Sequence, residues 1–243
     1  MPILRAVVFD LDDTLYPERE YVKSGFKAVA AWVEKCLGIP QDLALQAFLR
    51  LFAEGKRGDI FDIWLSDQGI TPELWVPQMV EVYRNHQPHI IPYKDVLALL
   101  PQLRQVYRLG VVTDGHAYVQ RKKLEALKLV SYFDAIVFSD DLGKEAWKPS
   151  IIPFESILKR LRTKGHESVY VADNPLKDFV GARAVGMWTV RVRRPEGLYS
   201  QLELPSLEYA PHWEISTFDE LTKVLAQIEG NLLNWHNGVD SHD

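Results

Sequence analysis

VVFDLDDTL, residues 7–15, joins an apolar run to three acidic side chains within four positions. The residues before Asp10 are β-branched or aromatic, a composition that favours a buried β-strand. Asp10, Asp12 and Asp13 follow at once, and carboxylates that crowd together repel one another. Because burial of an unpaired carboxylate is costly, the stretch predicts a strand that ends where a cation balances the acidic side chains.

The composition is that of an ordinary globular protein. The chain has 243 residues, of which 47% are hydrophobic and 25% charged, and its formal net charge is −5. A net negative charge argues against general affinity for nucleic acid polymers or anionic membranes. Apolar runs of the roughly 20 residues needed to cross a bilayer are absent, so we expect no membrane partner.

Cys36 is the single cysteine, so no disulfide can form within one chain and a reducing compartment is expected. We expect Cys36 itself to be a small buried packing residue of a helix. The N-terminal residues lead into a strand without the pattern of a signal peptide. These features predict a cytoplasmic protein and say nothing of its oligomeric state.

Strands and helices alternate along most of the chain. One strand, residues 3–9, precedes a block in which only helical periodicity is evident. Four more strands follow, separated by helices, at residues 109–113, 135–139, 168–172 and 188–192. This alternation is typical of a parallel sheet covered on both faces. We therefore predict an α/β fold, a doubly wound (Rossmann-like) parallel core of residues 1–15 and 92–243, with residues 16–91 inserted after the first strand as an all-helical cap.

Polar residues follow four of the predicted strands, and doubly wound sheets bind ligands beyond the carboxyl ends of their strands. Besides Asp10 and Asp12, these residues are Thr113, Lys148, Asp173 and, about one helical turn later, Asp178. Oxygen ligands from separate strand ends suit Mg²⁺. A hydroxyl group and a fixed ammonium group suit phosphoryl oxygens. The four clusters together indicate an active site.

This constellation resembles the haloacid dehalogenase-like superfamily of phosphohydrolases over residues 3–15 and 95–192. The inserted helices resemble the C1-type cap of that superfamily. Its four motifs are matched in order by Asp10-Leu11-Asp12-Asp13-Thr14 (DxDxT), by Thr113, by Lys148 in WKPS, and by Asp173 and Asp178 in VADNPLKDFVGA.

The resemblance implies a role for each matched residue. Asp10 would be the nucleophile that forms an aspartyl-phosphate, and Asp12 would protonate the leaving group and then activate water. Thr113 and Lys148 would hold the phosphoryl group. Mg²⁺ would be bound by Asp10, the backbone carbonyl of Asp12 and Asp173, with Asp178 supporting the metal or its water shell.

Three positions depart from the superfamily pattern. Asp114, Ser150 and Ala172 stand where Asn, Asp and Gly are usual. Asp114 adds a negative charge near a bound phosphate, so we leave it out of the catalytic set.

The leading prediction is a Mg²⁺-dependent phosphomonoesterase that acts on a small soluble phosphate ester through an aspartyl-phosphate. Two alternatives stay open: a phosphomutase of the same superfamily, and a catalytically silent phosphate-binding protein. A calcium loop is disfavoured because an EF-hand needs Gly and Glu where Leu15 and Tyr21 stand. The P-loop motif GxxxxGK[ST] is absent from the sequence.

Overall fold

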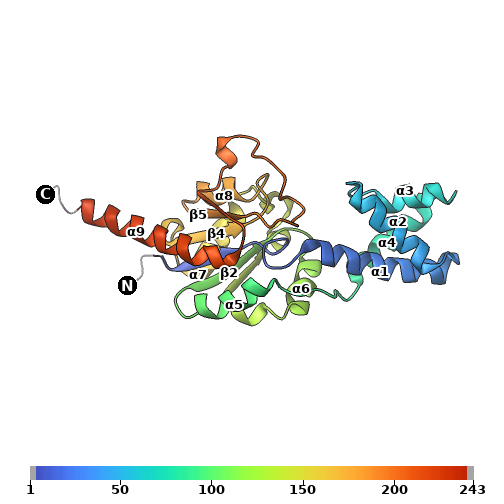
Figure 1. The fold of residues 1–243 in the computed structure, drawn as a ribbon, viewed down its shortest axis with the longest axis horizontal. Coiled ribbons are helices and arrows are strands. Elements are labelled where there is room, and N and C mark those ends of the chain that lie inside the picture. The colour runs from blue at the N-terminus through green and yellow to red at the C-terminus, as the bar shows by residue number, and fades with distance from the viewer. Residues whose placement is uncertain (1–3, 240–243) are drawn as a thin grey trace. The chain divides into compact units, whose positions relative to one another are not determined.

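The computed structural model describes residues 4–239 (Figure 1). Its core is a parallel sheet of six strands in the order β3-β2-β1-β4-β5-β6. This is the strand order of a doubly wound sheet, so the predicted fold class is confirmed. The strands are β1 (Ala6–Phe9), β2 (Arg108–Thr113), β3 (Ala135–Phe138), β4 (Ser168–Ala172), β5 (Trp188–Val192) and β6 (Trp213–Ile215).

The edge strand β6 is absent from the sequence prediction, which has five strands. It is only three residues long, and it follows a stretch of about 20 residues without regular periodicity. It pairs with β5 in the register Val190↔Trp213. A strand of three residues is too short to show an alternating pattern, so its pairing becomes evident only in the folded chain.

Helices cover the sheet because the strands bury side chains on both faces. Ala6 and Val8 of β1 join one apolar cluster with α7 (Ile152–Leu161) and α8 (Phe179–Ala184). On the alternate side of β1, the ring of Phe9 stacks on that of Phe218 at 5.6 Å between centroids. The remaining helices of this part are α5 (Lys94–Leu103), α6 (Ala117–Ala126) and α9 (Leu221–Val239).

The chain divides into two compact units. The core unit combines the residues up to Glu18 with those from Ile91 onward, and the helical unit is Arg19–Ile90. The helical unit is built around aromatic side chains, with the Phe48 ring 5.2 Å from that of Phe61 and 5.1 Å from that of Trp64. Its helices are α1 (Glu18–Leu37), α2 (Gln41–Ala53), α3 (Ile60–Asp67) and α4 (Pro72–Asn85).

Cys36 is exposed near the end of α1, so the expectation of a buried cysteine is wrong. The apolar face of α1 is formed by other residues, among them Phe26, Val29 and Val33, and Cys36 lies outside this set.

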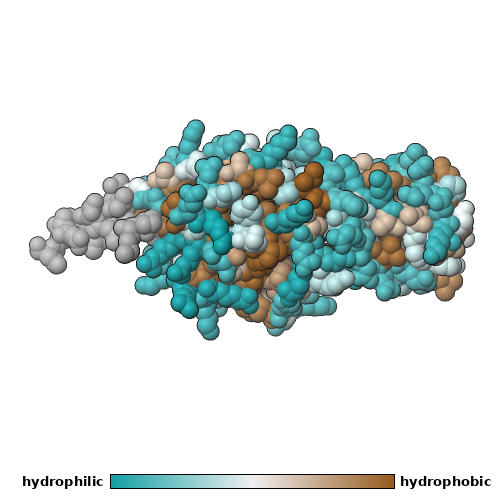
Figure 2. Space-filling model, turned by 90° about the horizontal axis from the view of Figure 1, so that it is seen from below, coloured by the Kyte–Doolittle hydropathy of each residue, from teal (hydrophilic) through white to brown (hydrophobic). Residues whose placement is uncertain are grey.

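The face drawn in Figure 2 is mostly hydrophilic, with patches of hydrophobic residues. Exposed apolar side chains of the core unit include Leu97 of α5 and Tyr118 of α6. Scattered exposure of this kind is normal in globular proteins. None of the helices within residues 4–239 is long and apolar enough to cross a membrane.

Gly181 of α8 marks a close approach between that helix and the loop after Lys148. A Cβ atom at this position would lie 2.4 Å from the carbonyl oxygen of Pro149 and 2.7 Å from that of Ser150. We expect Gly181→Ala to lower the free energy of unfolding by about 1–3 kcal/mol, because the backbone must shift to relieve the clash.

The matched control is Gly230→Ala in α9, where an added Cβ meets no atom within 4 Å. This change should leave stability unchanged or raise it by up to about 1 kcal/mol, as expected for a helix interior. Thermal unfolding of both variants is the measurement. Equal melting temperatures for the two variants would contradict the prediction that a Cβ atom at position 181 clashes with the backbone.

Candidate active site

Three of the predicted site residues lie at the ends of neighbouring strands. Asp10 follows β1, Thr113 ends β2 and Asp173 follows β4. Since β1 lies between β2 and β4, the sheet brings these residues to one edge, where doubly wound sheets bind ligands. The backbone N–H of Asp10 donates to the carbonyl of Val171 at 2.9 Å, so pairing with β4 continues past the end of β1 and fixes Asp10.

The ammonium group of Lys148 lies at the centre of this edge. Its Nζ is 2.6 Å from Oδ1 of Asp10 and 2.7 Å from Oδ1 of Asp178. It also donates to the hydroxyl of Tyr170 at 3.0 Å, and its side chain is 0% exposed. Burial opposes the charged form, but attraction to Asp10 and Asp178 raises the pKa of Lys148 well above its usual value. Lys148 is therefore a fixed positive charge.

Asp10, Asp173 and Asp178 form an acidic cluster. Each is buried, and each offers a carboxylate oxygen that lies within 4.8 Å of the others. Asp178 is held in place by the backbone N–H of Asn174, which donates to its Oδ2 at 2.9 Å. The hydroxyl of Thr14 donates to Asp173 at 3.5 Å. Three hard oxygen donors in this spacing fit a divalent cation such as Mg²⁺.

The electrostatics of the acidic cluster also favour a cation. Burial, together with repulsion from Asp178, raises the pKa of Asp10 to about 6 even though Lys148 opposes this shift. Burial and repulsion from Asp178 and Asp10 likewise raise the pKa of Asp173 well above its usual value. One ammonium group thus does not balance the carboxylates that surround it, and a bound divalent cation would.

The carboxylate of Asp12 lies outside the acidic cluster. Its Oδ1 accepts hydrogen bonds from Lys123 Nζ at 2.7 Å and from the hydroxyl of Tyr16, and its Oδ2 accepts one from Gln120 Nε2 at 2.8 Å. Burial would raise the pKa of Asp12, but the ion pair with Lys123 and these hydrogen bonds lower it below its usual value. The side chain of Asp12 is thus held apart from the cluster, which leaves its backbone carbonyl as the ligand that the resemblance implies.

Thr113 and Asp12 share a hydrogen-bond partner. The side chain of Thr113 is buried, and its Oγ1 accepts a hydrogen bond from Nε2 of Gln120 at 2.6 Å. The same nitrogen donates to Asp12. Sequence reasoning missed Gln120 and Lys123, although their spacing of three places them on one face of the helix that follows Thr113.

Two other aspartates of the region stabilise the local backbone. Asp13, in a left-handed conformation with φ of 50°, accepts hydrogen bonds from the N–H groups of Glu18 at 2.8 Å and Leu198 at 2.7 Å. Asp114 accepts the N–H of Lys148 at 3.3 Å, and its other oxygen lies 3.6 Å from Nζ of Lys177. The additional charge of Asp114 therefore has its own partner, and it fixes the backbone of Lys148.

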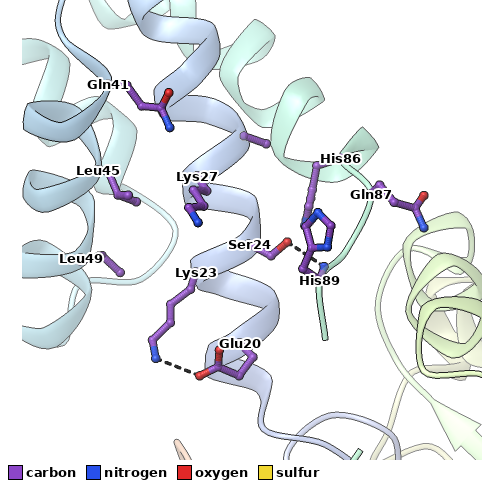
Figure 3. Close-up of a pocket in the computed structure, with 11 residues that line it drawn as sticks. Glu20, Lys23, Ser24, Lys27, Gln41, Leu45, Leu49, His86, Gln87 and His89 are labelled. Atoms are coloured by element: carbon purple, nitrogen blue, oxygen red, sulfur yellow. Dashed lines mark hydrogen bonds and ion pairs between the residues drawn. The ribbon is translucent and has the colours of Figure 1, made fainter. Parts of the chain in front are cut away.

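The helical unit has a pocket of its own, of about 810 Å³, which Figure 3 shows. Lys23 and Lys27 lie along one side of it, and Lys23 forms an ion pair with Glu20 at 2.9 Å. Ser24 accepts a hydrogen bond from the backbone N–H of His89 at 2.9 Å, which ties α1 to the segment after α4. The other lining residues are Ala28, Gln41, Leu45, Leu49, His86 and Gln87.

Comparisons with known proteins agree with this geometry. The haloacid dehalogenase-like hydrolase family matches residues 7–192. A glyceraldehyde 3-phosphate phosphatase of Methanopyrus kandleri is 34% identical over 93% of this chain and 99% of the relative, and one of Methanocaldococcus jannaschii is 29% identical over the same shares. The crystal structure of a HAD phosphatase from Thermococcus onnurineus has 30% sequence identity to this chain. The two superpose over 91% of this chain and 98% of the other, with a TM-score of 0.61. The chain therefore belongs to the haloacid dehalogenase-like hydrolase family, as its four motifs predict.

Proposed function

We propose that the chain is a phosphomonoesterase that hydrolyses a small phosphorylated metabolite, with Asp10 as the nucleophile. One observation carries the proposal: Asp10 lies in the acidic cluster against the buried Lys148, while the carboxylate of Asp12 is held apart from that cluster. We infer that Asp10 attacks beside the ammonium group of Lys148 and that Asp12 transfers protons. Family membership and the names of the relatives support the same reaction.

The reaction has two steps. Asp10 takes up the phosphoryl group and then releases it, while Asp12 gives a proton and then regains one. In the first, an oxygen of Asp10 attacks phosphorus, the bond from phosphorus to the leaving oxygen breaks, and Asp12 gives that oxygen a proton. In the second, water attacks the aspartyl-phosphate and gives a proton to Asp12. The bond between phosphorus and Asp10 then breaks, which releases inorganic phosphate and restores both side chains.

The phosphoryl group is held by Thr113 and Lys148 in this proposal. The hydroxyl of Thr113 can donate to a phosphoryl oxygen, and Lys148 supplies a fixed positive charge beside Asp10. Asp10, Asp173 and the backbone carbonyl of Asp12 would hold Mg²⁺, with Asp178 in support. When bound, this ion neutralises charge on the phosphoryl oxygens and so allows an anionic ester to approach the carboxylates.

The names of the relatives point to a triose phosphate or a similar small sugar phosphate as the substrate. We propose that the helical unit acts as a C1-type cap, and that its pocket, with Lys23 and Lys27, contributes to the choice of substrate. The single cysteine agrees with a cytoplasmic site of action.

A panel of metabolite phosphates tests the proposed function. The purified protein should release inorganic phosphate from triose phosphates in the presence of Mg²⁺, and a chelator should reduce the rate by about 100-fold or more until Mg²⁺ is restored. A full rate in excess chelator would exclude the metal assignment. An absence of phosphate release from every member of the panel would favour a phosphate-binding protein.

Asp10→Asn should abolish hydrolysis and, without metal, stabilise the fold. The folded-state pKa of Asp10 is raised from 3.8 to about 6, so the wild-type protein loses stability as pH rises through this window, whereas Asn does not titrate. In chelator at pH 7.5, the variant should be more stable by up to about 3 kcal/mol. This difference should shrink toward pH 4.

Thermal unfolding with and without Mg²⁺ measures this effect, and Mg²⁺ should stabilise the wild type more than Asp10→Asn because the variant lacks one ligand. An Asp10→Asn variant that melts below the wild type in chelator at pH 7.5 would show that repulsion does not dominate at this site.

Asp12→Asn should separate the two steps. p-Nitrophenyl phosphate has a weakly basic leaving group that needs no acid, so the variant should transfer phosphoryl once and then stall for lack of a base. The expected record is a burst of nitrophenolate equal to the enzyme concentration, with phosphate retained on the protein. An alkyl phosphate should give almost no burst. Equal losses on both substrates without trapped phosphate would remove the two roles assigned to Asp12.

A further inference from the structure

We propose that Gln120 and Lys123 of α6 are positioning residues that hold the acid–base carboxylate of Asp12 for the hydrolysis of the aspartyl-phosphate. The proposal rests on the proposed function, because it assigns these residues to a step of that reaction. It concerns residues that none of the four sequence motifs contains.

The geometry accounts for both oxygens of the carboxylate. Lys123 donates to Oδ1 of Asp12 at 2.7 Å, and Gln120 donates to Oδ2 at 2.8 Å. The two donors are three residues apart, so they lie on the same face of α6. A carboxylate held at both oxygens by one rigid helix cannot rotate without breaking at least one of these bonds.

Lys123 is buried where it meets Asp12. The Lys123 side chain is 6% exposed and that of Asp12 is 20% exposed, in an otherwise polar helix. Lysine is almost never buried unless it is paired. The adjacent Lys122, by contrast, is only half-buried and lies over the ring of Tyr118 at 5.3 Å. Lys123 thus combines burial with an ion pair to Asp12 at 2.7 Å.

Gln120 connects the acid–base residue to the phosphate-binding residue. A side-chain amide nitrogen has two hydrogens, and Nε2 of Gln120 can use one for Asp12 and the other for Thr113, at 2.8 and 2.6 Å. Because an ionised carboxylate can only accept, the amide must present its NH₂ group to Asp12. The position of the carboxylate is thereby tied to that of the group that holds the phosphoryl oxygens.

The second step depends on this arrangement more than the first does. In that step Asp12 acts as a carboxylate: it accepts a proton from the attacking water while the bond from phosphorus to Asp10 breaks. Lys123 and Gln120 hold the two oxygens of this carboxylate in one orientation. Phosphoryl transfer from an aryl phosphate to Asp10 needs no proton from Asp12, so it depends less on both residues than the second step does.

Lys123→Met tests the proposal with p-nitrophenyl phosphate in Mg²⁺. The variant removes the ammonium group and keeps the apolar stem. We expect kcat to fall about tenfold or more while kcat/KM stays within about threefold, because KM falls when the second step alone is slowed. A burst of nitrophenolate should precede the slow steady state.

Three further variants complete the experiment. Lys123→Arg should restore most of kcat, because guanidinium can also donate to the carboxylate, and Lys122→Met should behave as wild type. Gln120→Leu keeps the ion pair between Lys123 and Asp12, so it tests the proposal even if Lys123→Met fails to fold. It should lower kcat more than kcat/KM. A parallel fall of kcat and kcat/KM without a burst, or no change in either, would overturn the proposal.

Failure of this proposal is distinguishable from failure of the proposed function. If the wild type hydrolyses the aryl phosphate and Asp10→Asn does not, the proposed function stands and the Lys123 and Gln120 variants decide the positioning role. If Asp10→Asn retains the wild-type rate, the proposed function itself is wrong.

Discussion

The contact between the ammonium group of Lys148 and the carboxylates of Asp10 and Asp178 is the interaction on which the rest of the site depends. All three side chains are buried, so their charges interact strongly, and Lys148 offsets part of the repulsion between the two carboxylates. The parallel sheet imposes this proximity, because Asp10 extends the central strand β1 and Asp178 follows the neighbouring strand β4. With Asp173 added, the carboxylates outnumber the ammonium group, and the excess negative charge is what makes the edge of the sheet suited to a divalent cation.

Asp10 and Asp12 are two residues apart, yet their environments push their pKa values in opposite directions. Burial, with repulsion from neighbouring carboxylates, raises the pKa of Asp10 to about 6. For Asp12, the ion pair with Lys123 and the surrounding hydrogen bonds outweigh burial and lower the pKa. Each carboxylate therefore has its own ammonium partner, Lys148 for Asp10 and Lys123 for Asp12.

Most of the fold and the centre of the site could be predicted from the sequence, because strands that end in polar residues carry a local signal. Asp10, Thr113 and Asp173 each end or follow an apolar run, which is a local signal. Lys148 lies ten residues beyond the end of β3 and is identified only from its order among the motifs. Gln120 and Lys123 carry no such signal. The sequence pattern predicts that polar residues of a polar helix are exposed to solvent, and only the tertiary contacts show that these two are buried. The edge strand Trp213–Ile215 was missed for a related reason, since its pairing with β5 depends on contacts that no local pattern reveals.

Asp114 departs from the family pattern, and its local contacts accommodate the change. Aspartate in place of the usual asparagine adds a negative charge, which by itself would repel a phosphate group. One of its oxygens accepts the backbone N–H of Lys148, a bond that an asparagine side-chain oxygen could also accept. The other faces Lys177 at 3.6 Å, and that ammonium group offsets the added charge. The substitution therefore preserves the hydrogen bond that places Lys148, while the pair of Asp114 and Lys177 adds no net charge beside the acidic cluster.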